Sequence, residues 1–410
     1  MVRSMYTQDT IVDVWPFTRQ QEGQEFIIGR PDTGSFLAVS SEAVEVLDYL
    51  AEGRSVGEVA ALSQNELSAL EDFLSTLETQ GIVKPVRIEG DRDWTGTHAV
   101  APMRFHFGGF PQRVAQRIFS WPVLAATGVV IGLALLSLLR DPTLWPGARD
   151  LDFASHRTAM LGILVFFGYF SVVVHEASHV IAARAAGIDS RLGVGSRLWD
   201  FVIEADLSGL WSLPKRRRYL PIVAGSLLDA LLAALIVLLL VARSHSWVTI
   251  SPLTTQLLRA IMFTYMTRVM WQAFLFVRTD YYYVIANVFS CRNLMGDTED
   301  FLRNQFAKVT SWIRPVDQSA IPAREKRVIH AFAVIWFVGR AIAIVFLFKV
   351  TIPVFGYYAG NLVHAVRAGY SANRGDFLDS LLMMGYFIPI IVGMGMWLTS
   401  IARRLSKMGA

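Results

Sequence analysis

The apolar stretch around residue 175 contains the residues best suited to chemistry. Val174-His175-Glu176-Ala177-Ser178-His179-Val180 embeds an HExxH pattern in an otherwise apolar run. Positions i and i+4 share one face of a helix, so His175 and His179 can bind one metal ion while Glu176 activates a water beside it. This spacing is typical of zinc sites that hydrolyse peptide bonds. The alternative is a hydrogen-bonded polar cluster that only joins helices.

A third ligand must come from elsewhere, because catalytic zinc usually has three protein ligands and one position for water. The best candidate is Asp280, although Cys291 and the other histidines are possible ligands and Asp280 could instead be an exposed loop residue. Asp229 also lies within an apolar run, where an acid is costly unless it has a partner or a function. Asp229 is therefore a candidate ligand or proton carrier.

The elements that must position these residues are membrane helices. Of 410 residues, 53% are apolar and 18% charged, which is too apolar for an ordinary soluble enzyme. A span needs roughly 20 apolar residues, and six such runs predict a mainly α, polytopic membrane protein with about six transmembrane helices. These runs are Trp121–Leu139, Thr158–Ala183, Tyr219–Val241, Leu257–Val277, Val328–Phe355 and Phe377–Ile401.

Basic residues at the ends of these runs predict the topology, since Lys and Arg favour the cytoplasmic side. Four clusters fall on one side, which places both termini in the cytoplasm and brings His179 and Asp280 to the same side of the membrane. The clusters flank spans and are not interleaved with aromatic residues, which argues against nucleic-acid binding. They are Arg113 with Arg117, Lys215 to Arg218, Arg324 with Lys326 and Arg327, and Arg403 with Arg404 and Lys407.

The first 90 residues contain no such run and predict a small α+β domain without a cleaved signal peptide. Strand composition occurs at Ile11–Trp15, Glu25–Ile28 and Ser35–Val39, with a turn at residues 31–34. Ser40, Ser55 and Asn65 are expected to cap three helices, Gly81 to end the third, and Ile82–Val86 to form a wing strand. Residues 91–118 would be a linker and residues 119–410 the membrane domain. The single cysteine excludes an internal disulfide framework.

Several short motifs of this domain form a recognisable set: Ser40-Ser41-Glu42-Ala43, Leu47, Gly53, Ser55-Val56-Gly57-Glu58-Val59 and Gln80-Gly81-Ile82-Val83. Together they resemble the PqqD-like winged-helix domain. The resemblance implies recognition of the leader of a ribosomally synthesised, post-translationally modified precursor peptide, which typically adds a strand to the small sheet. The alternative is a winged helix that only docks a partner or packs on the membrane domain.

Residues 160–295 resemble the site-2 protease family of intramembrane zinc metalloproteases, especially its bacterial peptide-processing branch. That family carries HExxH on one membrane helix and a distant aspartate, which maps onto Asp280. Trp211, Leu213-Pro214, Arg216-Arg217-Arg218 and the Arg278-x-Asp280-x-Tyr282-Tyr283 pattern also resemble this branch. The resemblance implies zinc as cofactor, with His175, His179 and Asp280 as ligands and Glu176 as base.

This sequence departs from the family pattern at three places. Tyr281 stands where a glycine follows the aspartate, and Phe274-Leu275 stand where Asn-Pro is expected. The Gly-Pro-x-x-Asn motif reads Gly225-Ser226-Leu227-Leu228-Asp229. The ligands remain, but the contacts to substrate are expected to differ.

The expected function is maturation of a precursor peptide at the bacterial cytoplasmic membrane. Segment Leu192–Leu210 could offer a strand edge to an unwound substrate, or be an interfacial loop. The alternatives are a degenerate peptide-binding or immunity protein and a regulatory protease acting on a membrane-bound signalling protein. An exporter fits less well because no Walker-type phosphate loop is present.

Overall fold

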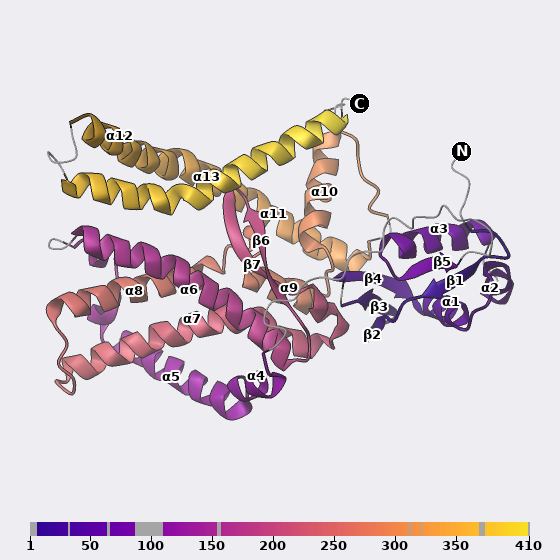
Figure 1. Cartoon of the computed structure of the whole chain (residues 1–410), viewed down its shortest axis with the longest axis horizontal. Helices are drawn as coiled ribbons and strands as arrows, with labels where there is room; N and C mark the ends of the chain where they lie inside the picture. Colours follow the sequence, from indigo (N-terminus) through magenta and orange to yellow (C-terminus); the bar gives the residue numbers. More distant parts are fainter. Residues whose placement is uncertain are drawn as a thin grey trace. The chain divides into compact units, whose positions relative to one another are not determined.

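The chain forms two compact units in a computed structural model, which describes residues 6–31, 33–63, 66–86, 110–153, 157–310, 313–319, 321–368 and 374–408. The amino-terminal unit comprises residues 1–115 together with the segments 183–191 and 206–218. The helical unit comprises residues 116–182, 192–205 and 219–410. Figure 1 shows the strands of the first unit in indigo. Residues 87–109, which hold most of the expected linker, lie outside the described part.

The amino-terminal unit contains two small antiparallel sheets and three helices. Strand β1 (Ile11–Val14) pairs with β5 (Val83–Val86), and β3 (Glu25–Arg30) lies between β2 (Thr18–Glu22) and β4 (Ser35–Ser40). Helices α1 (Ser41–Ala51), α2 (Val56–Ser63) and α3 (Leu67–Thr79) follow. Buried side chains from both sheets and all three helices form one core, which is the composition expected of an independently packed domain.

The local signals in this unit act as predicted at most positions. Ser40 Oγ accepts from Ala43 N–H, and Ser55 and Glu58 form a reciprocal capping box. Gly81 has a φ of +69°, which ends α3 as a left-handed residue. Strand β2 was not predicted, because Thr18–Glu22 is polar throughout. The expected cap at Asn65 lies outside the described residues.

The connector that precedes α7 (Lys215–Ser244) belongs to the amino-terminal unit. Its 3-10 helix η3 (Ser208–Ser212) packs on β2, β3 and β4. Arg218 is buried, lies over the Trp211 ring at 4.8 Å and pairs with Glu22 at 2.5 Å. Sequence analysis assigned Arg218 to a membrane-flanking cluster, but in the structure its charge is neutralised within this unit.

The remaining elements are mostly helices. Among the described residues, five helical segments are long and apolar enough to cross a membrane: Gln112–Arg140, Thr158–Ala185, Lys215–Ser244, Ala323–Ala368 and Arg374–Thr399. The individual helices are α4 (Gln112–Ile118), α5 (Trp121–Arg140), α6 (Arg157–Ala185), α8 (Pro252–Trp271), α9 (Asp280–Phe289), α10 (Leu294–Ala307), α11 (Ala323–Phe346), α12 (Ile352–Ala368) and α13 (Arg374–Met408).

The expected count of about six spans is corrected to five candidates. The run Leu257–Val277 divides into α8 and the 3-10 helix η4 (Leu275–Val277), and the Arg259 and Arg268 side chains contribute to making α8 too polar to qualify. An odd number of spans would separate the termini, so the expectation that both are cytoplasmic depends on whether α8 also crosses.

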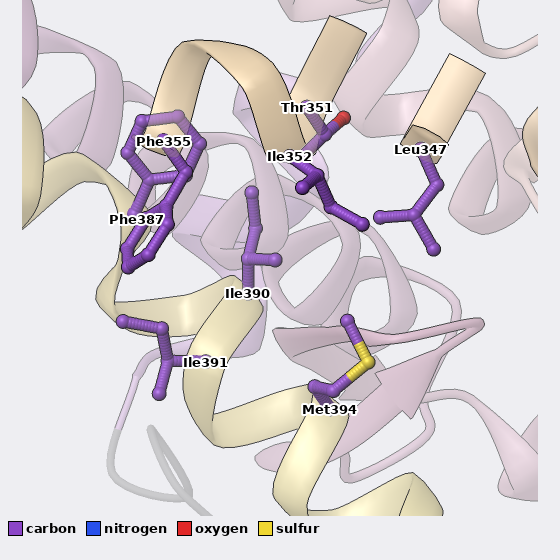
Figure 2. A pocket seen from close by; sticks show the side chains of 8 residues that line it. All are labelled: Leu347, Thr351, Ile352, Phe355, Phe387, Ile390, Ile391 and Met394. Atoms are coloured by element: carbon purple, nitrogen blue, oxygen red, sulfur yellow. The ribbon is translucent and has the colours of Figure 1, made fainter. Parts of the chain in front are cut away.

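Helices α11 and α12 are continuous through a π-helical turn, Leu347–Thr351, and α12 packs along α13. A cavity of about 210 Å³ lies beside this turn. Figure 2 shows side chains from both helices converging on it. Its lining is Leu347, Thr351, Ile352, Phe355, Phe387, Ile390, Ile391 and Met394. Thr351 carries the only hydroxyl group in this lining, so the hairpin is apolar inside as well as outside.

Segment Leu192–Leu210 contains a two-stranded sheet. Strands β6 (Arg191–Arg197) and β7 (Asp200–Asp206) pair across a two-residue turn in which Leu198 has a φ of +59°. The turn lies close to α13: a Cβ added at Gly393 would overlap the backbone of Trp199 to Phe201. The segment is therefore an ordered hairpin joining the end of α6 to the connector.

Candidate metal centre

Helix α6 brings the HExxH side chains together. His175 and His179 are 4% and 2% exposed, so both lie on a buried part of the helix surface. Their Nε2 atoms are 3.3 Å apart. One ligand atom from each of His175, Glu176 and His179 lies within 4.8 Å of the others. The i, i+4 spacing therefore produces a compact group of potential metal ligands on one helical face.

Asp280 joins the two histidines from a distant part of the chain. It is the first residue of α9, where a carboxylate is favoured by the helix dipole, and its N–H donates to Gln272 Oε1. Its Oδ2 atom lies 3.6 Å from His175 Nε2 and 3.5 Å from His179 Nε2. Ser226 on α7 donates to that oxygen at 2.6 Å. The structure thus places the predicted third ligand residue beside the other two.

Helix α7 contacts all three of these side chains. The Pro221 carbonyl lies 2.8 Å from His179 Nδ1, and Asp229 Oδ2 lies 2.7 Å from His175 Nδ1. A carbonyl or carboxylate oxygen accepts, so each Nδ1 is the donor in these contacts and leaves Nε2 as the nitrogen that can bind a metal. The two Nε2 atoms and Asp280 Oδ2 face one another, so a cation at this point could bind all three.

The separations fit a zinc ion. Tetrahedral coordination at Zn–N and Zn–O lengths of about 2.0–2.1 Å requires ligand atoms about 3.3–3.4 Å apart. The three observed separations are 3.3, 3.5 and 3.6 Å. Gly225 on α7 keeps the adjoining space open, because an added Cβ would overlap both Nε2 atoms. Donor chemistry, spacing and space all suit a metal held by His175, His179 and Asp280.

Glu176 lies on the same helix face and contacts the hairpin. Its Oε2 accepts from Ala205 N–H in β7 at 2.8 Å. The carboxylate is half-buried, in contrast to the fully buried histidines. It is therefore the member of the group best placed to exchange a proton with a substrate. The strand edge predicted in residues 192–210 lies directly beside this carboxylate.

The structure separates the other candidates from the ligand atoms. Cys291 packs among Tyr282, Leu294 and Met295 in an apolar cluster. Asp229 contacts the far nitrogen of His175, so it orients a ligand and does not join the ligand atoms. Sequence reasoning missed Ser226 and Arg268 as parts of this site. The polarity of Arg268 within the least apolar run was the available signal.

The residues before Asp280 depart from regular helix. Arg278 has a φ of +57°, and Thr279 Oγ1 donates to the Gln272 carbonyl. Gly339 on α11 allows Phe276 to approach, since a Cβ there would overlap the ring. This tight turn aims Asp280 at α6 although Tyr281 replaces the expected glycine.

Comparison with known proteins assigns neither a family nor a function to the chain. No protein-family model, curated protein or solved structure matches the chain. The geometry of the site and the sequence motifs are therefore the basis for any functional proposal.

Proposed function

We propose that this chain is an intramembrane zinc metalloprotease of the site-2 protease type that hydrolyses a peptide bond. The observation that carries the proposal is the meeting of His175, His179 and Asp280 at 3.3–3.6 Å. Both histidines and the neighbouring Glu176 lie on α6, a helix apolar enough to cross a membrane. Buried ionisable groups in such helices are costly and usually serve a function. A bacterial cytoplasmic membrane is the proposed location.

In the proposed mechanism, His175, His179 and Asp280 hold the metal, and Pro221, Asp229 and Ser226 fix the orientation of those three side chains. Zinc bound there would supply Lewis-acid chemistry, acidifying a water molecule and polarising a carbonyl. Glu176 accepts the proton from the attacking water and delivers it to the leaving amine. The Glu176–Ala205 bond implies that Glu176 must exchange one partner before it acts.

The proposed substrate is a precursor peptide whose leader binds the amino-terminal unit. The winged-helix motifs support this role, and a leader strand could add near Glu25–Ile28 or near the wing at Gln80–Val86. Strand β3 has a partner on both sides, so residues 25–28 offer no free edge. In the part of the chain that the structure describes, β5 forms a two-stranded sheet with β1, and the order of this sheet leaves room for a further strand beside the wing near Gln80–Val86. A leader would add there as a further strand.

A catalytically inactive peptide-binding protein is the second candidate. The hydrogen bond between Glu176 and Ala205 favours it, because a base already bonded to backbone is less available to water. Such a protein would keep the peptide-binding unit and lose hydrolysis. A regulatory protease would share the metal centre and differ in substrate.

The decisive experiment uses full-length protein purified in detergent, with its zinc content measured and a precursor peptide followed by mass spectrometry. We expect about one zinc per chain, cleavage that stops on chelation and cleavage that returns with zinc. Asp280→Ala should lose the metal, whereas Cys291→Ser should keep it. Stoichiometric zinc without cleavage of any precursor would favour the inactive binding protein.

A further inference from the structure

Asp229 is the most buried acidic residue of the helical unit among the described residues, and its carboxylate makes polar contacts with His175 and Arg268. It is 1% exposed. Its Oδ2 lies 2.7 Å from both His175 Nδ1 and Arg268 Nε, and its Oδ1 accepts from Arg268 Nη2 at 2.9 Å. This is a bidentate arginine–carboxylate pair with an imidazole on the same oxygen. Such geometry is specific as well as strong.

Arg268 connects the pair to a third helix. It lies on α8, whereas Asp229 lies on α7 and His175 on α6. The remaining guanidinium nitrogen, Nη1, donates to Ser171 Oγ on α6 at 3.0 Å, and the Tyr265 ring lies 5.2 Å from the guanidinium carbon. The three helices are thus joined by one charged group directly behind a metal-ligand candidate.

We propose that Asp229 is a positioning residue that holds His175 Nε2 towards the metal, and that Arg268 is the counter-ion that fixes the position of this carboxylate. The inference rests on the proposed metal site. A carboxylate that accepts from the far nitrogen of a histidine ligand fixes its tautomer and ring orientation. An isolated buried carboxylate would be costly, and the bidentate arginine offsets that cost.

This arrangement explains a departure from the resembled family. Position 229 carries an aspartate where Asn is expected, which introduces a negative charge into an apolar helix. Arg268, which makes α8 less apolar than the other long helices, supplies the matching positive charge. The charges of Asp229 and Arg268 make physical sense only as a pair, because either charge alone would be buried without its partner.

The test uses full-length protein in detergent and four variants: Asp229→Leu, Arg268→Gln, the double variant Asp229→Asn with Arg268→Gln, and Arg259→Gln as the control. Arg259 also lies on α8 and also pairs with an aspartate, Asp150 at 3.0 Å. Three readouts are measured: the zinc Kd by chelator competition, the melting temperature of zinc-free protein, and turnover of a precursor peptide.

We expect Asp229→Leu and Arg268→Gln each to weaken zinc binding by about 10–100-fold, the range typical of lost contacts behind a metal ligand. Arg268→Gln should also lower the melting temperature of the zinc-free protein. The double variant should recover both properties in large part, because a neutral amide pair leaves no unbalanced charge. Arg259→Gln should leave the zinc Kd within about threefold of the parent.

Three results would overturn the inference. The first is an Arg268→Gln variant that binds zinc as tightly as the Arg259→Gln control. The second is a double variant whose zinc Kd and melting temperature are no closer to the parent than those of Arg268→Gln. The third is an Asp229→Leu variant with parental zinc affinity but no turnover, which would make Asp229 a proton carrier. If Asp229→Leu does not fold, the double variant still decides. Failure of the proposed function would appear separately, as zinc binding by the parent without peptide cleavage.

Discussion

The metal centre and the amino-terminal unit place their polar residues in opposite ways. At the centre, the charged side chains are buried or half-buried and have polar partners, as Asp229 has Arg268 and Asp280 has Ser226. In the amino-terminal unit, most polar groups cap helices or lie exposed, and the core is built from common aliphatic residues. A buried polar group needs a reason, so the centre points to chemistry while the other unit points mainly to a fold.

The largest expected effect is a loss of turnover at the metal centre, when its proposed base is replaced. Glu176→Gln should lower kcat by about 10²–10⁴-fold, the usual contribution of a general base, while leaving zinc content unchanged. Peptide cleavage by mass spectrometry and metal analysis of the same sample measure both. Parental turnover by the Glu176→Gln protein would mean that the centre is not a protease site of this kind.

A second substitution tests whether zinc affinity depends on the open space at the centre as well as on the ligands. Gly225→Ala should reduce zinc affinity by more than about tenfold, because its Cβ would overlap both Nε2 atoms while every ligand remains. Gly168→Ala, on α6, is the matched control since nothing lies near the added Cβ. Equal zinc affinity in the two variants would place the metal away from Gly225.

For the amino-terminal unit, the expected effect is on substrate capture. Full-length precursor should have a kcat/KM about 10²-fold above that of the leaderless peptide, since a bound leader raises the local concentration of the cleavage segment. Excess free leader should compete with the precursor only, and a scrambled leader should not compete. Deleting residues 1–90 would be a poorer test, because η3 and Arg218 would lose the sheet they contact. Identical kcat/KM values would reduce this unit to a structural role.

The smallest expected effect concerns Asp200, a carboxylate whose pKa is shifted by burial alone, in contrast to Asp229 with its counter-ion Arg268. Burial raises the pKa of Asp200, at the hairpin turn, to about 6. The unfolded value is about 3.9, so the folded state binds this proton more tightly and stability falls as pH rises from about 4 to above 6. Asp200→Asn should therefore stabilise the protein at pH 8, by at most ~3 kcal/mol, and not at pH 4.

Thermal unfolding at both pH values measures the Asp200 effect. Asp141→Asn is the control with the opposite sign, because hydrogen bonds from Thr143 lower the pKa of Asp141. A gain at pH 4 equal to that at pH 8 would show that the Asp200 side chain acts through packing and not through its charge.

Sequence reasoning predicted the elements that depend on local signals. Capping by Ser40 and Ser55, the end of α3 at Gly81 and the helical HExxH segment all follow from residues a few positions apart. Asp280 was predicted as a ligand because the expected topology put it on the same side of the membrane as His179 and because the resembled family has a distant aspartate. The structure brings it to the histidines.

The rest depends on contacts between distant segments. Thr18–Glu22 forms a strand only because β3 pairs with it, and Arg218 is buried only because Glu22 faces it. Likewise, the role of Asp229 depends on Arg268, which is 39 positions away in the chain. In a hydropathy average along the sequence, Arg268 only makes its run less apolar, because such an average cannot recognise a counter-ion on another helix.

The arginines of α8 also bear on the order in which the chain is made. Their partners, Asp150 and Asp229, both precede α8 in the sequence, so both carboxylates are synthesised before the ribosome reaches Arg259 and Arg268. Neither of these ion pairs can therefore form until α8 has been made and packs against the earlier segments. Asp280 follows α8 in the chain, so the group formed by His175, His179 and Asp280 can be completed only after α8 has been synthesised.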